Sequence, residues 1–432
     1  MSQRNKFKES FLDYYRELLG PEFESYINAL ESGEIRRSLR VNTLKISKKE
    51  LKKWLVSQGY QVEDSPFSSD GIDISGSGAP LTLKLPYISG FTYPQDSASM
   101  FAVEILDPQP GEIVLDLTAA PGGKSTQIAQ RMKNTGVLIA NDMDTSRLKA
   151  LHSNLERLGV WNCVVTRMMP HKMAEIYPET FDRILLDPSC SGEGLLMKGG
   201  KPSFWSPKAL KHYASEQFGM LSSAYKMLKP CGRIVFSTCT LNLVENDGVV
   251  KRLLEKFPEA EVQKIHSPFP PRQLGDYMGW RFWPQITRTK GFFCVAIGKK
   301  KSVAGNISDY KFEFVEESKF RPYDLDCAFV EKDRNLFCVS REILKFPLPR
   351  GYSLSFPIQI NERLTYEGSL IPHIGRTELE LTRNEVEKFV AREAMKNRGI
   401  VDGTYIAKFG IFPLGIAKIH GERMEINFPR RY

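Results

Sequence analysis

Two cysteines and a carboxylate stand directly after apolar segments that have the composition of buried strands. Asp187 and Cys190 follow residues 184–186, and Cys239 follows residues 233–236. A thiolate is the nucleophilic form of cysteine, and a carboxylate can hold a reacting group through hydrogen bonds. Packing alone seldom requires two thiols and a carboxylate at neighbouring strand ends, so we expect these three residues to carry out chemistry.

The cysteine pattern as a whole excludes two common roles. Seven cysteines are an odd number, and no two of them are spaced as Cys-x-x-Cys. This suits neither a disulfide framework nor a zinc site, so we expect free thiols and no metal. Outside positions 190 and 239, the simplest role is a small buried apolar side chain. These other positions are Cys163, Cys231, Cys294, Cys327 and Cys338.

A loop of small residues follows the first apolar strand of the same region. It reads Thr118-Ala-Ala-Pro-Gly-Gly-Lys124 and leads into a predicted helix, so its backbone can approach a ligand closely. A phosphate-binding loop would need glycine where Thr118 stands, and the dinucleotide pattern Gly-x-Gly-x-x-Gly is absent. Both a nucleotide-hydrolysing enzyme and a nucleotide-dependent dehydrogenase are therefore disfavoured.

A second carboxylate follows the next strand along the chain. Asp142 comes directly after residues 137–140 and could accept hydrogen bonds from both hydroxyls of a ribose, which favours an adenosine-type ligand. A helix N-cap or a solvated turn would explain Asp142 about as well.

The elements that must position these residues alternate between apolar strands and helices. Such alternation predicts a parallel, doubly wound α/β sheet whose ligands lie at the carboxyl ends of the strands. The expected strands are residues 113–117, 137–140, 164–166, 184–186 and 233–236.

Smaller units flank the predicted sheet on both sides. The basic triplet Lys299-Lys300-Lys301 marks a boundary that is followed by a β-rich segment. We therefore expect domains at residues 1–90, 91–300 and 301–432. The first unit should contain a helix at residues 11–19, a strand at 38–44, a helix capped by Ser47 that runs through Trp54, and a loop at 64–80.

Composition narrows the class of protein further. Lys and Arg number 60 against 51 Asp and Glu, which gives a net charge of +9 and favours a polyanionic partner such as nucleic acid. The 41% of hydrophobic residues is typical of a folded protein, and the length of 432 residues predicts more than one domain. The chain has no apolar run long enough for a membrane helix and no signal-peptide core, so we expect a cytoplasmic protein that binds no membrane.

Several motifs occur in a fixed order between residues 36 and 297. They are Arg40-Val-Asn-Thr-Leu-Lys45, Gln95-Asp-Ser-Ala-Ser-Met100, the Ala-Ala-Pro-Gly-Gly-Lys124 loop, Asp187-x-x-Cys190-Ser-Gly-Glu-Gly194, Ser237-Thr-Cys239-Thr240 with Glu245-Asn246, and Arg281-x-Trp283-Pro284 with Gly291-Phe-Phe293. In this order they resemble the Nop/Sun family of RNA cytosine-C5 methyltransferases, and within it the RsmF-like bacterial ribosomal RNA enzymes.

The resemblance implies a fold and an activity. The fold is the class I, Rossmann-like methyltransferase fold that binds S-adenosylmethionine, with a small N-terminal α/β RNA-binding domain. A PUA-like, β-rich C-terminal RNA-binding domain is implied by residues 412–418 and 427–431. The implied activity is methylation of C5 of a cytosine in small-subunit (16S) ribosomal RNA by a monomer. Transfer RNA as the substrate, and a noncatalytic RNA-binding or ribosome-assembly factor, are the alternatives.

The resemblance also assigns roles to single residues. C5 of cytosine is a poor nucleophile until a thiolate adds to C6, and Cys239 is implied to be that thiolate. Cys190 is implied to assist release of the adduct, Asp187 to bind the N3 and amino edge of the ring, and Lys124 to belong to the same catalytic set. The implied cofactor-binding residues are Thr118, Ala119, Ala120, Pro121, Gly122, Gly123, Lys124, Asp142, Arg147, Met169 and Asp187.

The sequence departs from the family at a few positions. Met169 stands where an acidic residue usually contacts the adenine amino group, which could weaken cofactor binding by about 1 kcal/mol unless the thioether packs on the adenine. The order Pro188-Ser189 is reversed from the usual one, and Gln285 and Lys290 are also unusual. We expect weaker activity or altered substrate choice as the result.

Recognition of the cytosine edge requires an unstacked or flipped base. Basic residues would hold the phosphates, and aromatic residues would stack on bases. The candidates for these contacts are Arg36, Arg37, Arg40, Phe204, Trp205, Trp280 and Trp283.

Overall fold

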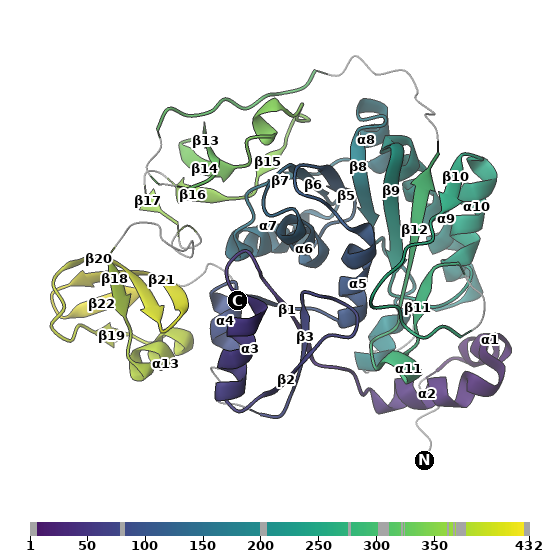
Figure 1. Ribbon diagram of the computed structural model, residues 1–432, viewed down its shortest axis with the longest axis horizontal. Coiled ribbons are helices and arrows are strands. Elements are labelled where there is room, and N and C mark those ends of the chain that lie inside the picture. The colour runs from purple at the N-terminus through teal and green to yellow at the C-terminus, as the bar shows by residue number, and fades with distance from the viewer. Residues whose placement is uncertain are drawn as a thin grey trace.

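The computed structural model describes most of the chain. The described residues are 7–77, 83–198, 205–274, 278–300, 311–320, 323, 325–360, 363–365, 368 and 377–426. A layered α/β body occupies the centre, and the C-terminal β-rich segments lie along one side of it (Figure 1). None of the helices in this part of the chain combines the length and the apolar character needed to cross a bilayer.

The central sheet contains the parallel core that the sequence predicts. Its order is β10-β12-β9-β8-β5-β6-β7-β15, with β11 paired to β12, and β9, β8, β5, β6 and β7 run parallel to one another. Chain order reverses direction beside β5, which creates the switch point where ligands bind in such sheets. The strands are β5 (Ile113–Asp116), β6 (Val137–Asn141), β7 (Cys163–Thr166), β8 (Phe181–Leu186), β9 (Leu228–Thr238), β10 (Ala260–Val262), β11 (Trp280–Phe282), β12 (Phe292–Lys299) and β15 (Ser353–Leu354).

Helices cover both faces of this sheet. Val114 and Leu115 are neighbours in β5 but point to opposite faces, and each joins a separate buried cluster. Both faces are therefore buried, which explains why consecutive residues near the centres of these strands are apolar. One face is covered by α5 (Ser97–Leu106), α6 (Gly123–Arg131) and α7 (Thr145–Leu158), and the other by α8 (Pro170–Ile176), α9 (Pro207–Met227) and α10 (Asp247–Lys256).

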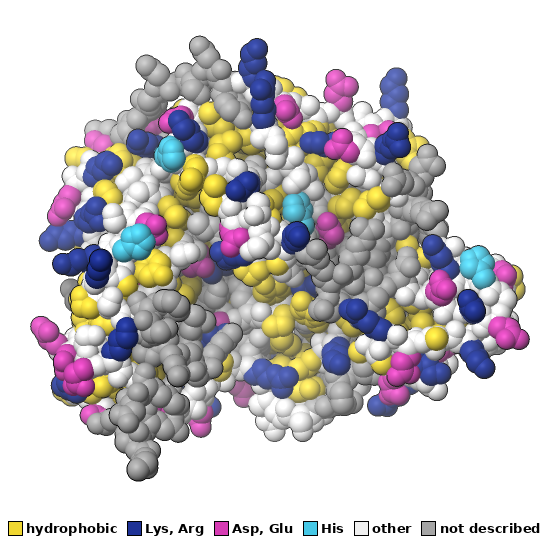
Figure 2. All heavy atoms as spheres, turned by 180° about the vertical axis from the view of Figure 1, so that it is seen from behind, with side chains coloured by type: hydrophobic (Ala, Val, Ile, Leu, Met, Phe, Trp, Pro, Cys, Tyr) yellow, Lys and Arg dark blue, Asp and Glu magenta, His cyan; other side chains and the backbone are white. Residues whose placement is uncertain are grey.

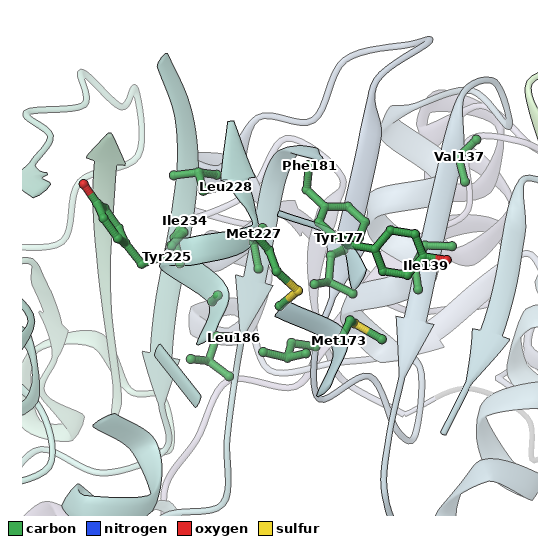
Figure 3. Packing of buried hydrophobic residues seen from close by; sticks show 14 of the residues in the cluster. Val137, Ile139, Met173, Tyr177, Phe181, Leu186, Tyr225, Met227, Leu228 and Ile234 are labelled. Carbon is green, nitrogen blue, oxygen red and sulfur yellow. The ribbon is translucent and has the colours of Figure 1, made fainter. Parts of the chain in front are cut away.

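Figure 3 shows the packing beneath α8 and α9. Met173 and Tyr177 from α8 and its C-terminus contact the same cluster as Ile139 of β6, Leu186 of β8 and Met227 of α9. All of these side chains are buried. The strand ends that carry the candidate residues are thus held by a tightly packed core.

The N-terminal unit has its own small sheet, in the order β2-β3-β1-β4. The expected loop at 64–80 is wrong in part, because β3 lies within it between β1 and β2. Ile72 and Ile74 supply the buried face of β3 despite the many polar residues around them. The capping box of Ser47 and Glu50 is confirmed at the start of α3. The elements are β1 (Ser38–Val41), α3 (Lys48–Ser57), β2 (Gln61–Asp64), β3 (Gly71–Ser75), α4 (Lys84–Ile88) and β4 (Thr92–Pro94).

The first two helices lie apart from this small sheet. Helices α1 (Glu9–Leu19) and α2 (Phe23–Ser32) are joined by the short η2 (Gly20–Glu22) and pack below the central body beside α11 (Pro284–Thr287) (Figure 1). Their apolar side chains share a cluster with Trp205, Leu241 and Trp283. The amino-terminal helices therefore contact the segments that follow Cys190 and Cys239.

The segment after residue 300 is β-rich, as expected. One sheet is β13-β14-β16-β17, a second is β18-β20-β21-β22-β19, and β15 extends the central sheet by pairing with β7. The expected match at residues 427–431 lies outside the described residues. The elements are β13 (Ala328–Lys332), β14 (Asn335–Val339), η4 (Ile343–Lys345), β16 (Pro357–Ile360), β17 (Arg363–Leu364), β18 (Glu378–Glu380), α13 (Arg383–Ala391), β19 (Met395–Lys396), β20 (Gly403–Phe409), β21 (Phe412–His420) and β22 (Arg423–Ile426).

One cysteine expectation is wrong. Cys327 and Cys338 form a disulfide across the β13–β14 hairpin, where free thiols were expected. Hairpin pairing sets Phe329 opposite Cys338, and this brings Cys327, two residues before Phe329, onto the same face as its partner. An odd cysteine count and the absence of Cys-x-x-Cys could not reveal this pair, because strand register created it. Cys163 and Cys294 are buried as expected, whereas Cys231 is exposed.

Candidate active site

The two thiols singled out in the sequence meet at the carboxyl edge of the sheet. Cys190 follows β8 and Cys239 follows β9, and these neighbouring parallel strands bring the Sγ atoms to 2.8 Å from each other. Cys239 is exposed and Cys190 is partly buried. The pKa of Cys190 is raised well above its ordinary value of 9.0, first by its hydrogen bond to Cys239 and then by burial. Cys190 therefore stays protonated at neutral pH.

Asp187 is held in one orientation beside the thiols. Its Oδ2 accepts a hydrogen bond from Lys124 Nζ at 2.5 Å, and its Oδ1 accepts one from Ser237 Oγ at 2.9 Å. Burial lowers the pKa of Lys124, but the charge and hydrogen bond of Asp187, together with smaller contributions from Asp116 and Cys239, raise it overall. The site thus contains a fixed carboxylate in contact with a charged ammonium.

The reversed Pro188-Ser189 order keeps this arrangement. Ser189 O accepts a hydrogen bond from Gln217 Nε2 at 3.0 Å, so residues 188–190 are held against α9. Asp187 still contacts Lys124 while Cys190 contacts Cys239. The local departure therefore leaves the carboxylate and the thiol in place.

The loop of small residues wraps around the ends of β5 and β6. Thr118 Oγ1 accepts from the backbone N–H of Asp187 at 3.0 Å, and Ala120 N donates to Asp142 Oδ2 at 3.0 Å. Gly122 has φ +104°, a conformation that favours glycine. The remaining loop contacts are Ala119 N to Asn141 O, Asn154 Nδ2 to Pro121 O, Thr126 Oγ1 to Gly122 O and Arg40 Nη1 to Gly123 O.

Arg147 and Met169 border the same end of the sheet. Arg147 donates to the carbonyl of Ala120 and lies 3.8 Å from Asp142 Oδ2. Met169 ends the segment after β7 and is 50% exposed, and Met143, next to Asp142, is 36% exposed. Large apolar side chains with this much exposure at two neighbouring strand ends offer a surface for a flat apolar ligand.

Comparison with known proteins decides the family. The model of the 16S rRNA methyltransferase RsmB/F family matches residues 103–298, and that of the N-terminal domain of the 16S rRNA methyltransferase RsmF matches residues 7–97. A ribosomal RNA small subunit methyltransferase F from Aeromonas hydrophila is 34% identical over 92% of this chain and 90% of its own length. The chain belongs to the RsmF family.

Other RsmF relatives and a solved structure agree. The Klebsiella pneumoniae ribosomal RNA small subunit methyltransferase F is 32% identical over 98% of this chain and 96% of its own length. A methyltransferase homolog protein from Pyrococcus horikoshii is 32% identical with a TM-score of 0.61, and the match covers 69% of this chain and 100% of that one. The RsmF-family chain is an S-adenosylmethionine-dependent methyltransferase with a Rossmann-like fold.

The residues of this RsmF-family site fit S-adenosylmethionine. Asp142 is 6% exposed, and although each of its carboxylate oxygens accepts one backbone N–H, each keeps further acceptor capacity for ribose hydroxyls. Met143 and Met169 provide apolar surface, and the Ala-Pro-Gly-Gly backbone lies between Asp142 and Lys124. No cluster of three potential metal-ligating side chains occurs among the residues that the structure describes.

Three expected RNA contacts of the RsmF-family chain are wrong. Arg40 is fully buried and donates to Thr126 and Gly123. Trp205 is buried and donates to Glu193 at 2.7 Å, while Trp283 is buried against the aromatic ring of Tyr26. These large side chains fill cores between chain segments that are distant in the sequence, so local composition could not place them. Arg37 is exposed, Arg36 and Trp280 are half-buried, and Phe204 lies outside the described residues.

Sequence reasoning missed one acidic residue of the RsmF-family site. Asp116 ends β5, is 1% exposed and accepts from Ser125 Oγ at 2.6 Å. Burial raises its pKa to about 7, and nearby Asp187 and Asp142 add to the shift. Its position at the end of the strand, two residues before Thr118, could have identified it.

Proposed function

We propose that this chain methylates C5 of a cytosine in small-subunit ribosomal RNA, with Cys239 as the covalent nucleophile. The observation that carries the proposal is the 2.8 Å contact between the Sγ atoms of Cys190 and Cys239 beside the Asp187–Lys124 pair. Bound S-adenosylmethionine would supply an electrophilic methyl group. The names of the Aeromonas and Klebsiella relatives support small-subunit ribosomal RNA as the substrate.

The first step is addition of the Cys239 thiolate to C6 of the cytosine. The new C6–S bond pushes electrons into the ring and gives C5 the character of an enamine carbon that attacks the methyl group. Asp187, whose carboxylate is fixed by Ser237 and Lys124, would accept a hydrogen bond from the cytosine amino group. It would hold N3 through a proton that lies between the carboxylate and N3, since N3 itself carries no hydrogen. The positive charge of Lys124 would stabilise the negative charge that develops on the ring.

Release requires loss of the C5 proton and cleavage of the C6–S bond. The electrons of the C5–H bond form the C5–C6 double bond, and Cys239 leaves as a thiolate. Cys190 stays protonated in the free protein mainly because of Cys239. Once Cys239 Sγ is bonded to C6 it no longer shares a hydrogen bond with Cys190, so the pKa of Cys190 should fall. Cys190 can then lose its proton to water and take up the C5 proton as the base.

Cofactor placement follows from the same geometry. Asp142 would accept from the ribose hydroxyls, residues 118–124 would line the cofactor, and Met169 would cover the adenine. Arg147 would support the loop through its contact with Ala120. We infer that the thioether, by packing on the adenine, recovers part of the affinity that the usual acidic residue provides, because Met169 is half exposed at the strand end.

The surface that binds RNA would include residues outside the catalytic site. On the face shown in Figure 2, Lys and Arg side chains are scattered among acidic ones and do not form one patch. We infer that the flanking units hold RNA through several separate contacts, of which exposed Arg37 is a candidate.

We also infer that the protein acts as a monomer in the cytoplasm. The domain boundaries at residues 90 and 300 remain predictions, and so does the PUA-like character of the C-terminal unit.

Bisulfite sequencing tests the reaction and the substrate together. Unmodified 16S ribosomal RNA and unmodified transfer RNA are each incubated with the protein and S-adenosylmethionine. We expect a protected cytosine in the ribosomal RNA alone, and none when Cys239→Ala is used. Protection only in transfer RNA would overturn the substrate, and binding of S-adenosylmethionine without methylation of either RNA would overturn the reaction in favour of a noncatalytic RNA-binding factor.

A further inference from the structure

The loops that carry the two thiols are tied together by a buried polar network around Asn242. The side-chain amide of Asn242 donates to Glu193 Oε1 at 3.2 Å and to Glu245 Oε1 at 2.9 Å. Its Oδ1 accepts the backbone N–H of Glu245 at 2.9 Å. All three residues are buried, so their polar groups have no water to replace a lost partner.

Glu193 belongs to the loop that follows Cys190. Besides Asn242, its carboxylate accepts from Trp205 Nε1 at 2.7 Å, from the backbone N–H of Leu241 at 2.7 Å and from the hydroxyl of Tyr15. Burial and then Glu193 raise the pKa of Tyr15 well above 10.0, so the phenol stays a donor. Glu193 thereby joins the Cys190 loop to the Cys239 loop and to α1.

Glu245, which lies in the loop after Cys239, also contacts the loop after Cys190. Although it follows Cys239 in the chain, it accepts from the backbone N–H of Ser191 at 3.0 Å and from Gln217 Nε2 at 2.9 Å. Burial raises the pKa of Glu245 above its ordinary value of 4.5. Each buried carboxylate therefore crosses from one thiol loop to the other.

Direct contacts between the loops run alongside these carboxylates. Gly194 N donates to the carbonyl of Cys239 at 2.9 Å, and the hydroxyls of Ser191 and Thr240 lie 2.9 Å apart. Asn242 Nδ2 also lies 2.8 Å from Thr240 Oγ1. The residues next to both cysteines are thus restrained within the same network.

Asn242 donates to both carboxylates, and a side chain that only accepts hydrogen bonds cannot replace it. It presents two N–H groups between two buried carboxylates, and removing them would leave like charges facing each other in a region of low dielectric. The loops would separate to relieve that repulsion. A carboxylate of the same size at this position would worsen it, because aspartate carries no donor when ionised.

We propose that Asn242 is a positioning residue which, through Glu193 and Glu245, holds the thiol of Cys190 against that of Cys239. The proposal rests on the proposed function for the catalytic meaning of the thiol pair. The quantity that the proposal concerns is the distance between the two sulfur atoms, and this distance can be tested without RNA or the methyl donor.

Disulfide trapping measures that approach directly in the full-length protein. Diamide, an azo oxidant, takes one hydrogen from each thiol and becomes the hydrazine while the Cys190–Cys239 disulfide forms. The rate is followed by alkylation of the remaining thiols and peptide mass mapping, and Cys190→Ala identifies the background. We expect rapid trapping in the unaltered protein and trapping at least about tenfold slower in Asn242→Ala and Asn242→Asp, because small displacements of reacting groups cost large factors in rate.

A matched control separates positioning from general loss of stability. Asn162→Ala removes another fully buried asparagine, which directly precedes β7 at the opposite, amino-terminal edge of the sheet and donates to Thr135 O at 3.0 Å. We expect it to lower the melting temperature while trapping stays fast. If Asn242→Ala does not fold, Glu193→Gln is used in its place. The amide NH2 of the glutamine would face the donors that now bond to the Glu193 carboxylate, so the same network would be broken.

The outcomes are distinct from those of the bisulfite test. Slow trapping in the Asn242 variants with normal trapping in Asn162→Ala supports the proposal, even if no RNA is methylated. Equal trapping in folded Asn242→Ala, Asn242→Asp and unaltered protein overturns it, as does the absence of trapping in the unaltered protein. In the methylation reaction, the same variants should lose kcat while KM for S-adenosylmethionine stays unchanged.

Discussion

The guanidinium of Arg40 donates from Nη2 to Thr126 Oγ1 at 2.6 Å and so joins strand β1 of the N-terminal unit to the first turns of α6. Arg40 is fully buried, and burial lowers its pKa to about 10, which leaves it charged at neutral pH. It also donates to Gln95 and to the carbonyl of Gly123 in the loop of small residues, 118–124. The N-terminal unit therefore supports the loop that we propose lines the cofactor.

Loss of this arginine should affect both stability and cofactor binding. Arg40→Ala leaves the Gly123 carbonyl, the Thr126 hydroxyl and the Gln95 amide without their donor, so we expect a loss of about 3 kcal/mol in the free energy of unfolding. Calorimetry should show weaker S-adenosylmethionine binding. Exposed Arg37→Ala is the control and should change neither quantity; an equal effect of both substitutions would contradict the role of burial.

The two cysteines should behave differently when each is removed. Cys190→Ala should accumulate protein covalently attached to RNA, because the adduct forms but its release is slow. Cys239→Ala should form no adduct, because no sulfur attacks C6. A denaturing gel with labelled RNA distinguishes the two, and equal behaviour of the variants would refute the assigned roles.

Met169 offers a gain of function. It is the N-cap residue of α8, has extended backbone angles and forms no side-chain cap hydrogen bond. Met169→Asp should stabilise α8 by about 1 kcal/mol and, if an acceptor reaches the adenine amino group, tighten S-adenosylmethionine binding about fivefold. Thermal denaturation and calorimetry measure the two effects. Weaker cofactor binding by the variant would show that packing of the thioether on the adenine matters more.

Asp116 should make stability depend on pH. Burial raises its pKa from an ordinary 3.8 to about 7 in the folded chain, so folding favours the protonated form. This contribution is fully present below 3.8 and is lost as pH rises through about 7. Asp116→Asn has a neutral side chain of the same size as protonated Asp116. The free energy of unfolding of this variant should therefore fall less than that of the unaltered protein between pH 3.8 and about 7. Urea denaturation at a series of pH values checks the difference, and parallel curves would falsify the assignment.

Local patterns in the sequence determined the central sheet and the meeting of its reactive groups. Apolar runs at 113–115 and 184–186 predicted buried parallel strands, and such strands end at one edge. Cys190, Cys239 and Asp187 were therefore expected at the same edge, and the pairing of β8 with β9 brings them together. The capping box at Ser47 was equally local, because its partner stands three residues away.

Only the tertiary structure decided how distant segments pack against this edge. Tyr15 and Glu193 are separated by 178 positions, yet they form a buried hydrogen bond that brings α1 to the thiol loops. The burial of Trp205 and Trp283, the disulfide of Cys327 and Cys338, and the crossing of Glu245 to Ser191 arise in the same way. Each depends on packing or strand register between elements far apart in the chain, and neither residue type nor spacing encodes that information locally.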